Sequence, residues 1–290
     1  MRHALAAALL ALAAPVAAQP EAAGDDARRP PLFVLEDADS KVYLLGSIHV
    51  LPASALPLPA SVEAAFRAAD VVAFEIDLDV AQSQAPSMVQ KGLNGTPVAE
   101  ALSPVQRKRL DAALERLGVP ASTLDRVEPW LAALMVTAFD VQKRGAMVEG
   151  GVDRHLFDRA KALDREIVPL ETVALQTDVF DGLAVKDQVA YLMATLDGLD
   201  ADGDAYQLLL DAWAEGDDDG LATMMREGFG ASPSLFDRLL TRRNRAWVPQ
   251  VEALLARDRD ALVVVGAGHL VGEESVVALL REAGYAVARQ

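Results

Sequence analysis

The chain has 290 residues, 52% hydrophobic residues, no cysteine and a formal net charge of −16 at pH 7. The hydrophobic fraction suffices for a packed core, while the missing cysteine excludes disulfides, thiol catalysis and thiolate-rich metal sites. Any metal ion would therefore have to bind His, Asp or Glu. The negative charge argues against nucleic acid and anionic membrane surfaces as partners.

The first twenty residues, MRHALAAALLALAAPVAAQP, have the features of a secretory signal peptide. Arg2 precedes an Ala/Leu run, and the small residues Val16 and Ala18 stand where a signal peptidase reads. The run is too short to cross about 30 Å of hydrocarbon comfortably, so we expect no stable membrane span. The sequence thus predicts a signal peptide over residues 1–18, a flexible mature N-terminus over 19–30, and a periplasmic or secreted domain over 31–290.

The predicted domain begins with two apolar strands, PLFVLE and KVYLLGS, joined by the turn DADS. A proline-marked loop at residues 56–59 leads to a short helix that Ser61 would cap. The apolar run VVAFEIDLD then predicts a buried strand.

The middle of the chain is predicted to be mostly helical. Ser103 and Gly118 bound one helix, and further helices are expected over 128–144, over GVDRHLFDRAKALD and through most of 172–260. EIVPLE is a short strand among them, and the chain ends with the strand LVVVGAGH, the helix GEESVVALLREAG and the strand YAVARQ. The predicted fold is α/β, with a mixed β-sheet core formed by N- and C-terminal segments and a large helical insertion.

Two predicted strand ends share a Gly-x-x-His spacing: Gly46 with His49, and Gly266 with His269. Glycine, including Gly268 in the second motif, permits a sharp turn and the close approach of a ligand or another backbone. Strand ends are where open α/β sheets present functional groups. The pair therefore predicts an active centre, whereas His155, in a helix among charged residues, is interpreted as a solvated position.

Glu75 ends an apolar strand, where an unpaired carboxylate would be costly. If that strand neighbours the one before His49, the two side chains emerge at one edge of the sheet. Two histidines and a carboxylate form a recognised ligand set for a hydrolytic divalent metal ion. Asp77 is expected on the same face as Glu75, either supporting the centre or as a solvated acid.

Three further residues are candidates for the site. Glu171 ends EIVPLE and could be a general base, a metal ligand or a helix N-terminal partner. Arg243, next to Asn244 in a long helix, could hold a substrate carboxylate or stabilise an oxyanion.

Trp130 and Trp247 occupy apolar helix positions and are interpreted as core residues.

The motifs LLGSIHVLP, FEID, LET and VVVGAGHLVGEESVVALLREAGY, in this order, resemble the TraB/GumN family, GumN branch. Gly151-Val152-Asp153, Gln176 and Arg243-Asn244 followed by Trp247 also match. The resemblance runs from about residue 32 to 287. It implies an α/β fold shared with Tiki-type metalloproteases, erythromycin-esterase-like proteins and ChaN-like haem-binding lipoproteins, and a centre at His49, His269 and Glu75.

The leading hypothesis is a metal-dependent hydrolase of the cell envelope, most plausibly a peptidase. His49, His269 and Glu75 would hold a divalent metal ion that activates water against a peptide or small-molecule substrate. Glu171 would be general base or a supporting residue, and Arg243, beside Asn244, would stabilise developing negative charge. The alternatives are a metal-independent esterase with a histidine base, and a non-catalytic protein that binds haem, a peptide or a polysaccharide.

Overall fold

The computed structural model describes residues 27–50, 56–144, 151–200, 205–229 and 233–290. The predicted signal peptide, and most of the predicted flexible N-terminus, lie outside these residues. Six strands make up one sheet: β1 (Leu32–Glu36), β2 (Lys41–Ser47), β3 (Val71–Phe74), β4 (Glu166–Pro169), β5 (Ala261–Gly266) and β6 (Ala288–Arg289).

The strand order in the sheet is β4-β3-β5-β2-β1-β6. The four strands β4, β3, β5 and β2 run parallel to one another, while β1 is antiparallel to both β2 and β6. The predicted hairpin of β1 and β2 is confirmed, with Asp37 accepting from the backbone N–H of Ser40 in its turn. The structure confirms the predicted α/β class with a mixed sheet.

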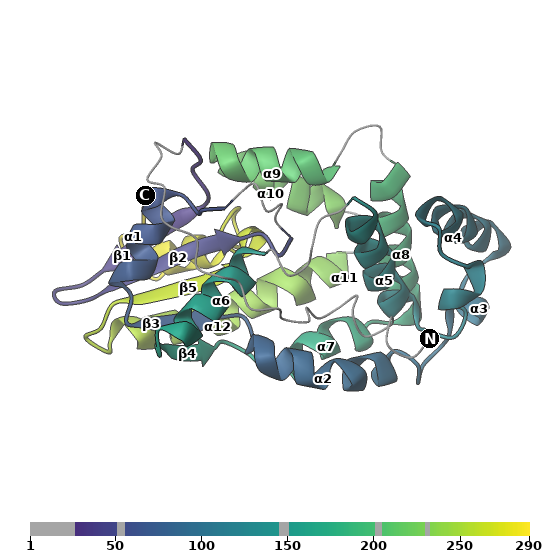
Figure 1. The fold of residues 1–290 in the computed structure, drawn as a ribbon, viewed down its shortest axis with the longest axis horizontal. Coiled ribbons are helices and arrows are strands. Elements are labelled where there is room, and N and C mark those ends of the chain that lie inside the picture. The colour runs from purple at the N-terminus through teal and green to yellow at the C-terminus, as the bar shows by residue number, and fades with distance from the viewer. Residues whose placement is uncertain (1–26, 51–55, 145–150, 201–204, 230–232) are drawn as a thin grey trace.

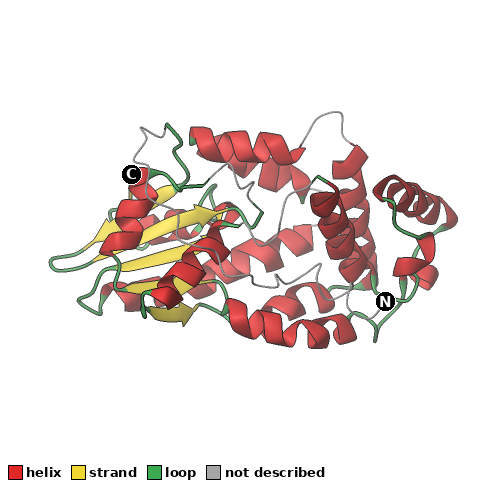
Figure 2. Cartoon of the chain, in the orientation of Figure 1, coloured by secondary structure: helices red, strands yellow, loops and turns green. Residues whose placement is uncertain are grey.

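Thirteen α-helices occur in the described ranges (Figure 2). They are α1 (Ala60–Ala68), α2 (Leu78–Lys91), α3 (Val98–Ala101), α4 (Pro104–Leu117), α5 (Pro129–Lys143), α6 (Val152–Ala162), α7 (Val173–Asp181), α8 (Val185–Asp200), α9 (Ala205–Glu215), α10 (Asp218–Gly228), α11 (Pro233–Phe236), α12 (Arg242–Leu255) and α13 (Val276–Glu282). Shorter turns are the 3₁₀ segments η2 (Ala121–Leu124) and η5 (Ala267–His269) and the π-helical η4 (Asp237–Thr241).

Local sequence signals explain several helix ends. α4 begins with a capping box, in which Ser103 and Gln106 each bond the other's backbone N–H, and it ends at Gly118 in the left-handed conformation (φ 73°). Two predictions of detail were wrong. α1 starts one residue before Ser61, after Pro59, without a side-chain cap. β3 stops at Phe74 because the chain turns into α2, for which Asp77 is the N-cap.

Helices cover both faces of the sheet (Figure 1). Alternate residues of the central strands face opposite ways. Phe74 and Val264 pack with α1, α6, α9 and α10 on one face, while Ala73 and Val265 pack with α12 and α13 on the other. A third apolar cluster, built from α4, α5 and α8 around Trp130, forms the core of the helical insertion beside the sheet. None of the helices in the described ranges is both long and apolar enough to cross a membrane.

Candidate active site

Four parallel strands deliver the candidate residues to one edge of the sheet. His49 follows β2, Glu75 follows β3, Glu171 follows β4, and His269 follows β5. The strand before Glu75 does not neighbour the strand before His49, because β5 lies between them and pairs with both. The second Gly-x-x-His motif thus lies between the first motif and the glutamate.

Gly266, at the end of β5, is the point where the three predicted metal-site residues meet. A Cβ on Gly266 would lie 3.3 Å from Glu75 Oε1, 3.4 Å from His49 Nε2 and 3.7 Å from His269 Cδ2. The Gly266 N–H also donates to Glu75 Oε1 at 2.8 Å. Gly266 has a negative φ (−51°), so its backbone conformation does not require glycine, and an added Cβ would be in contact with all three side chains.

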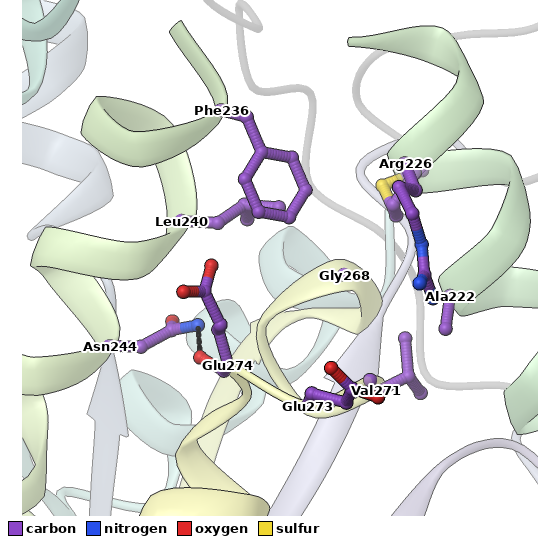
Figure 3. Close-up of a pocket in the computed structure, with 11 residues that line it drawn as sticks. Ala222, Arg226, Phe236, Leu240, Asn244, Gly268, Val271, Glu273 and Glu274 are labelled. Carbon is purple, nitrogen blue, oxygen red and sulfur yellow. Dashed lines mark hydrogen bonds between the residues drawn. The ribbon is translucent and has the colours of Figure 1, made fainter. Parts of the chain in front are cut away.

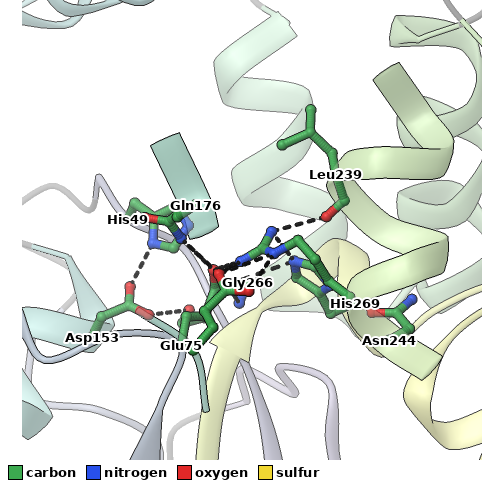
Figure 4. A network of polar contacts seen from close by, with 11 residues as sticks. His49, Glu75, Asp153, Gln176, Leu239, Asn244, Gly266 and His269 are labelled. Atoms are coloured by element: carbon green, nitrogen blue, oxygen red, sulfur yellow. Dashed lines mark hydrogen bonds and ion pairs between the residues drawn. The ribbon is translucent and has the colours of Figure 1, made fainter. Parts of the chain in front are cut away.

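Asp153, on α6, fixes the orientation of the His49 ring. Its Nδ1 lies 2.9 Å from Asp153 Oδ2, while Ser47 Oγ donates to Asp153 Oδ1 at 2.6 Å (Figure 4). The negative charge of Asp153 raises the pKa of His49 above its ordinary value, with burial acting against it. The His49 side chain is 64% exposed, so solvent screens part of this effect. With Nδ1 on Asp153, its Nε2 faces the centre.

His269 is buried, and the indole of Trp247 lies 4.5 Å from its ring centroid. Asn244 donates through Nδ2 to the Glu274 carbonyl at 2.7 Å, so its Oδ1 is the acceptor for His269 Nδ1 at 2.6 Å. This fixes the proton on Nδ1 and leaves the lone pair on Nε2. Burial lowers the pKa of His269 to about 3, so the imidazole is neutral at pH 7.

Arg243 joins the acidic residues to His269. Its Nη2 donates to Glu75 Oε2 at 2.5 Å and to Glu171 Oε1 at 2.6 Å, and its Nη1 donates to His269 Nε2 at 3.1 Å. Nη1 also donates to the Leu239 carbonyl in the π-helical turn η4, which ends two residues before Arg243. π-Helical turns are frequent at functional sites. The guanidinium is thus a buried counter-charge for two carboxylates rather than a free donor.

The two glutamates differ in electrostatic environment. Burial opposes ionisation of Glu75, but Arg243 and then His269 and His49 hold its pKa well below its usual range. Burial raises the pKa of Glu171, and Arg243 offsets this only in part. Gln176, on α7, bonds both carboxylates, at 3.1 Å to Glu75 and 3.3 Å to Glu171.

Other candidates lie away from the centre. Asp77 does not support it, because its carboxylate accepts from the backbone N–H groups of Asp79 and Val80 as the cap of α2. His155 is only partly exposed on α6, with Arg159 as its neighbour at 3.5 Å. A Cβ on Gly46 would lie 3.0 Å from Ala267 Cα, so a larger residue would crowd this strand end.

No site role was predicted from the sequence for Asp153 or Gln176, although both match family motifs. Trp247 is a buried core residue, as predicted, and its indole also packs on His269. Gly151 was the available signal for Asp153. It packs against the backbone of His49, and the Val152 N–H bonds the Ile48 carbonyl at 3.0 Å, which places Asp153 one residue further along beneath His49. Nothing in the spacing of Gln176 relative to Glu75 predicts their contact across 101 residues.

The donor set fits a divalent metal ion in type and orientation. Both histidines have Nδ1 held by an outer partner and Nε2 directed inward, the arrangement seen in metal-bound histidines. In the described part of the chain, however, no three acidic or histidine side chains already form a ligand set. Arg243 already donates to Glu75 Oε2 and His269 Nε2, two atoms that a metal ion there would need.

Comparison with known proteins identifies relatives of this chain. The uncharacterized protein YbaP of Escherichia coli (strain K12) is 28% identical over 243 residues, covering 82% of this chain and 87% of YbaP, and the Shigella flexneri protein of that name matches equally. A metalloprotease TIKI homolog of Amphimedon queenslandica is 42% identical over 57 residues, covering 19% of this chain and 11% of that protein. Residues 31–289 match the model of the TraB/PrgY/gumN family, and the chain therefore belongs to this family.

Proposed function

We propose that this protein is a metal-dependent hydrolase of the cell envelope that acts on peptides, with His49, His269 and Glu75 as its metal-binding residues. The convergence of these three side chains within 4 Å of one point beside Gly266 supports the proposal most directly. A divalent metal ion held there would lower the pKa of a bound water and polarise a substrate carbonyl. The local similarity to a metalloprotease TIKI homolog favours the same chemistry.

The chain's own residues have distinct tasks in this proposal. Asp153 and Asn244 fix the orientation of the two imidazoles. Arg243 balances the charge of Glu75 and Glu171, so that two buried carboxylates can lie close together. Glu171, whose pKa is raised by burial, is a group beside the centre that is able to take up a proton. The exposed ring of His49 is the side from which a substrate can approach.

Location in the cell envelope rests on the N-terminal sequence. The basic start, apolar run and small residues before Gln19 have the order of a cleaved signal peptide. Expression of the full chain with mass analysis of the mature N-terminus tests this proposal. A mature protein that begins at Gln19 in the periplasm or medium supports it, and an uncleaved cytoplasmic product contradicts it.

Metal analysis combined with turnover of a peptide library tests the hydrolase. We expect the mature protein to bind about one divalent ion and to cleave peptides. His49→Ala and His269→Ala should abolish both. His155→Ala is the matched control, since His155 contacts Arg159 outside the centre, and it should change neither. A protein whose metal content and turnover are unaffected by His49→Ala and His269→Ala would contradict the proposal.

A second candidate is a metal-independent esterase, favoured by the position of Arg243. The guanidinium already supplies a cation between Glu75 and His269, and the pair of His49 with Asp153 resembles a base held by its orienting carboxylate. Since Asp153 raises the pKa of His49, ester hydrolysis by this base should accelerate as the pH rises through that pKa. A chelator distinguishes the two candidates, because it should abolish metal-dependent turnover and leave this one intact.

A further inference from the structure

A pocket of about 140 Å³ opens beside the η5 turn, between α10, η4 and the loop that leads to α13 (Figure 3). Its wall is mainly apolar, with Gly268 at the η5 side. The apolar lining residues are Ala222, Met225, Phe236, Leu240 and Val271. Met225 packs directly on the turn, because a Cβ on Gly268 would lie 2.8 Å from its sulfur.

The pocket adjoins the candidate active site through two residues. Gly268 lines the pocket and directly precedes His269 in the chain, so the Cα atoms of the two residues lie about 3.8 Å apart. Asn244 also lines the pocket while its Oδ1 accepts from His269 Nδ1. His49, Glu75 and His269 do not themselves line the pocket, so it would take a side chain beyond the reacting bond of an extended peptide, which advances about 3.3–3.6 Å per residue.

The size and lining of the pocket select an apolar occupant. A cavity of roughly 150 Å³ lined by apolar side chains holds a benzene ring, so the pocket suits one Leu, Met or Phe side chain. Its polar groups lie at the edge, with Arg226 on α10 facing the exposed pair Glu273 and Glu274. Glu274 is fixed by Thr241 Oγ1 at 2.6 Å. Two carboxylates against one guanidinium disfavour an acidic substrate residue.

We propose that this pocket is the specificity site for one apolar side chain, Leu, Met or Phe, of a peptide substrate. The proposal rests on the peptide hydrolase proposed above and adds its substrate class. It makes Met225 and Leu240 specificity-determining residues and assigns the discrimination against acidic side chains to Glu273 and Glu274.

Methyl NMR of methionine-labelled protein tests the pocket without any turnover. The chain has seven methionines, and the Met225 signal is assigned by its loss in Met225→Leu. We expect N-acetyl-leucinamide and N-acetyl-phenylalaninamide to shift the Met225 methyl in a saturable manner, and N-acetyl-aspartamide to do so at least about tenfold more weakly. Absence of a Met225 shift with the apolar amides would overturn the proposal.

Variants on α10 supply the control. Ala222→Phe fills the pocket from its wall and should weaken binding of the leucine amide about tenfold or more, whereas Thr223→Phe, on the exposed side of the same helix, should not. Ala222→Leu is a smaller filling variant in case Ala222→Phe fails to fold, which circular dichroism reports. If Ala222→Leu, Thr223→Phe and wild type bind the leucine amide equally well, the proposed specificity site is wrong.

Cleavage of a peptide library separates this proposal from the proposed function. If wild type cleaves after or before apolar residues and Ala222→Leu shifts that preference toward smaller side chains, both are supported. If cleavage persists with an unchanged preference, the pocket assignment fails while the hydrolase stands. If the metal-loaded protein cleaves nothing, the hydrolase fails, and the Met225 titration still decides whether the pocket binds apolar side chains.

Discussion

Gly151 lies directly against the backbone of His49. A Cβ on Gly151 would be 2.3 Å from the His49 carbonyl oxygen and 2.7 Å from its carbonyl carbon. Since φ of Gly151 is −61°, glycine is required for this approach and not for an unusual conformation. This contact places the start of α6 next to the end of β2. In that position Asp153 contacts the ring of His49.

Gly151→Ala should therefore displace α6 from His49. We expect a loss of about 1–3 kcal/mol in the free energy of unfolding, as for other overpacked sites, together with weaker metal binding or turnover. Urea denaturation measures the first effect. Gly198→Ala on α8 is the matched control, because no atom lies within 4 Å of the added Cβ. It should be neutral or stabilise by up to about 1 kcal/mol. Equal effects of the two variants would contradict the role of Gly151.

The pair of His49 with Asp153 predicts a stability change on the alkaline side in metal-free protein. The folded-state pKa of His49 is raised, to about 9, from about 6.5 in the unfolded chain. Its contribution is thus complete below pH 6.5 and is lost as the pH rises toward 9. Because the ring is exposed, we expect about 1 kcal/mol or less.

Asp153→Asn should remove this alkaline loss and lower the pKa of His49, as followed by urea denaturation at pH 6 and pH 9 and by NMR titration. The His155 resonance should titrate as in wild type and serves as the internal control. An unchanged His49 titration curve in the variant would show that Asp153 does not charge the ring.

His269 predicts the opposite behaviour on the acid side. Its folded-state pKa is lowered to about 3, so between pH 6.5 and 3 the unfolded chain takes up a proton that the folded protein does not. Stability should fall with decreasing pH in that range, and His269→Gln should make the fall less steep. The free energy of unfolding of both proteins should be compared at pH 6.5 and pH 5. In this range the carboxylates of the unfolded chain stay largely ionised, because their ordinary pKa values are lower. Identical slopes for both proteins would contradict the prediction.

Arg243 and a divalent metal ion should compete for the same atoms. Arg243→Met leaves Glu75 and Glu171 buried without their counter-charge, which should cost about 3–5 kcal/mol of stability in chelated protein. Zn²⁺ should then raise the melting temperature more in Arg243→Met than in wild type. The control is Arg242→Met, whose exposed side chain pairs with Asp237, and it should change stability by only about 0.5 kcal/mol. A larger zinc effect in wild type would mean that Arg243 helps to hold the metal.

How far the sequence predicts this molecule depends on whether the signal is local. Apolar runs that stop at a polar residue predict the strand ends before His49, Glu75 and His269. The order of the predicted strands and helices predicts the α/β class. The position of β5 between β2 and β3 is not local, so the sequence could not give the neighbours of Glu75. Asp77 was misplaced because a chain leaving a strand can turn into a helix at once, and a short acidic side chain then serves as its cap. Arg243 shows the same limit. Its residue type predicts an interaction with a negatively charged group, but the residues that it contacts follow β3, β4 and β5, which are distant in the sequence.

The central position of β5 has a consequence for biosynthesis. β5 begins at Ala261, so 260 residues are made before it, yet it separates β2 from β3 in the finished sheet. A nascent chain that ends before residue 261 lacks the strand through which the two halves of the sheet are joined. Until His269 has been added, neither half holds a complete centre. The centre can therefore form only after almost the whole chain has been synthesised.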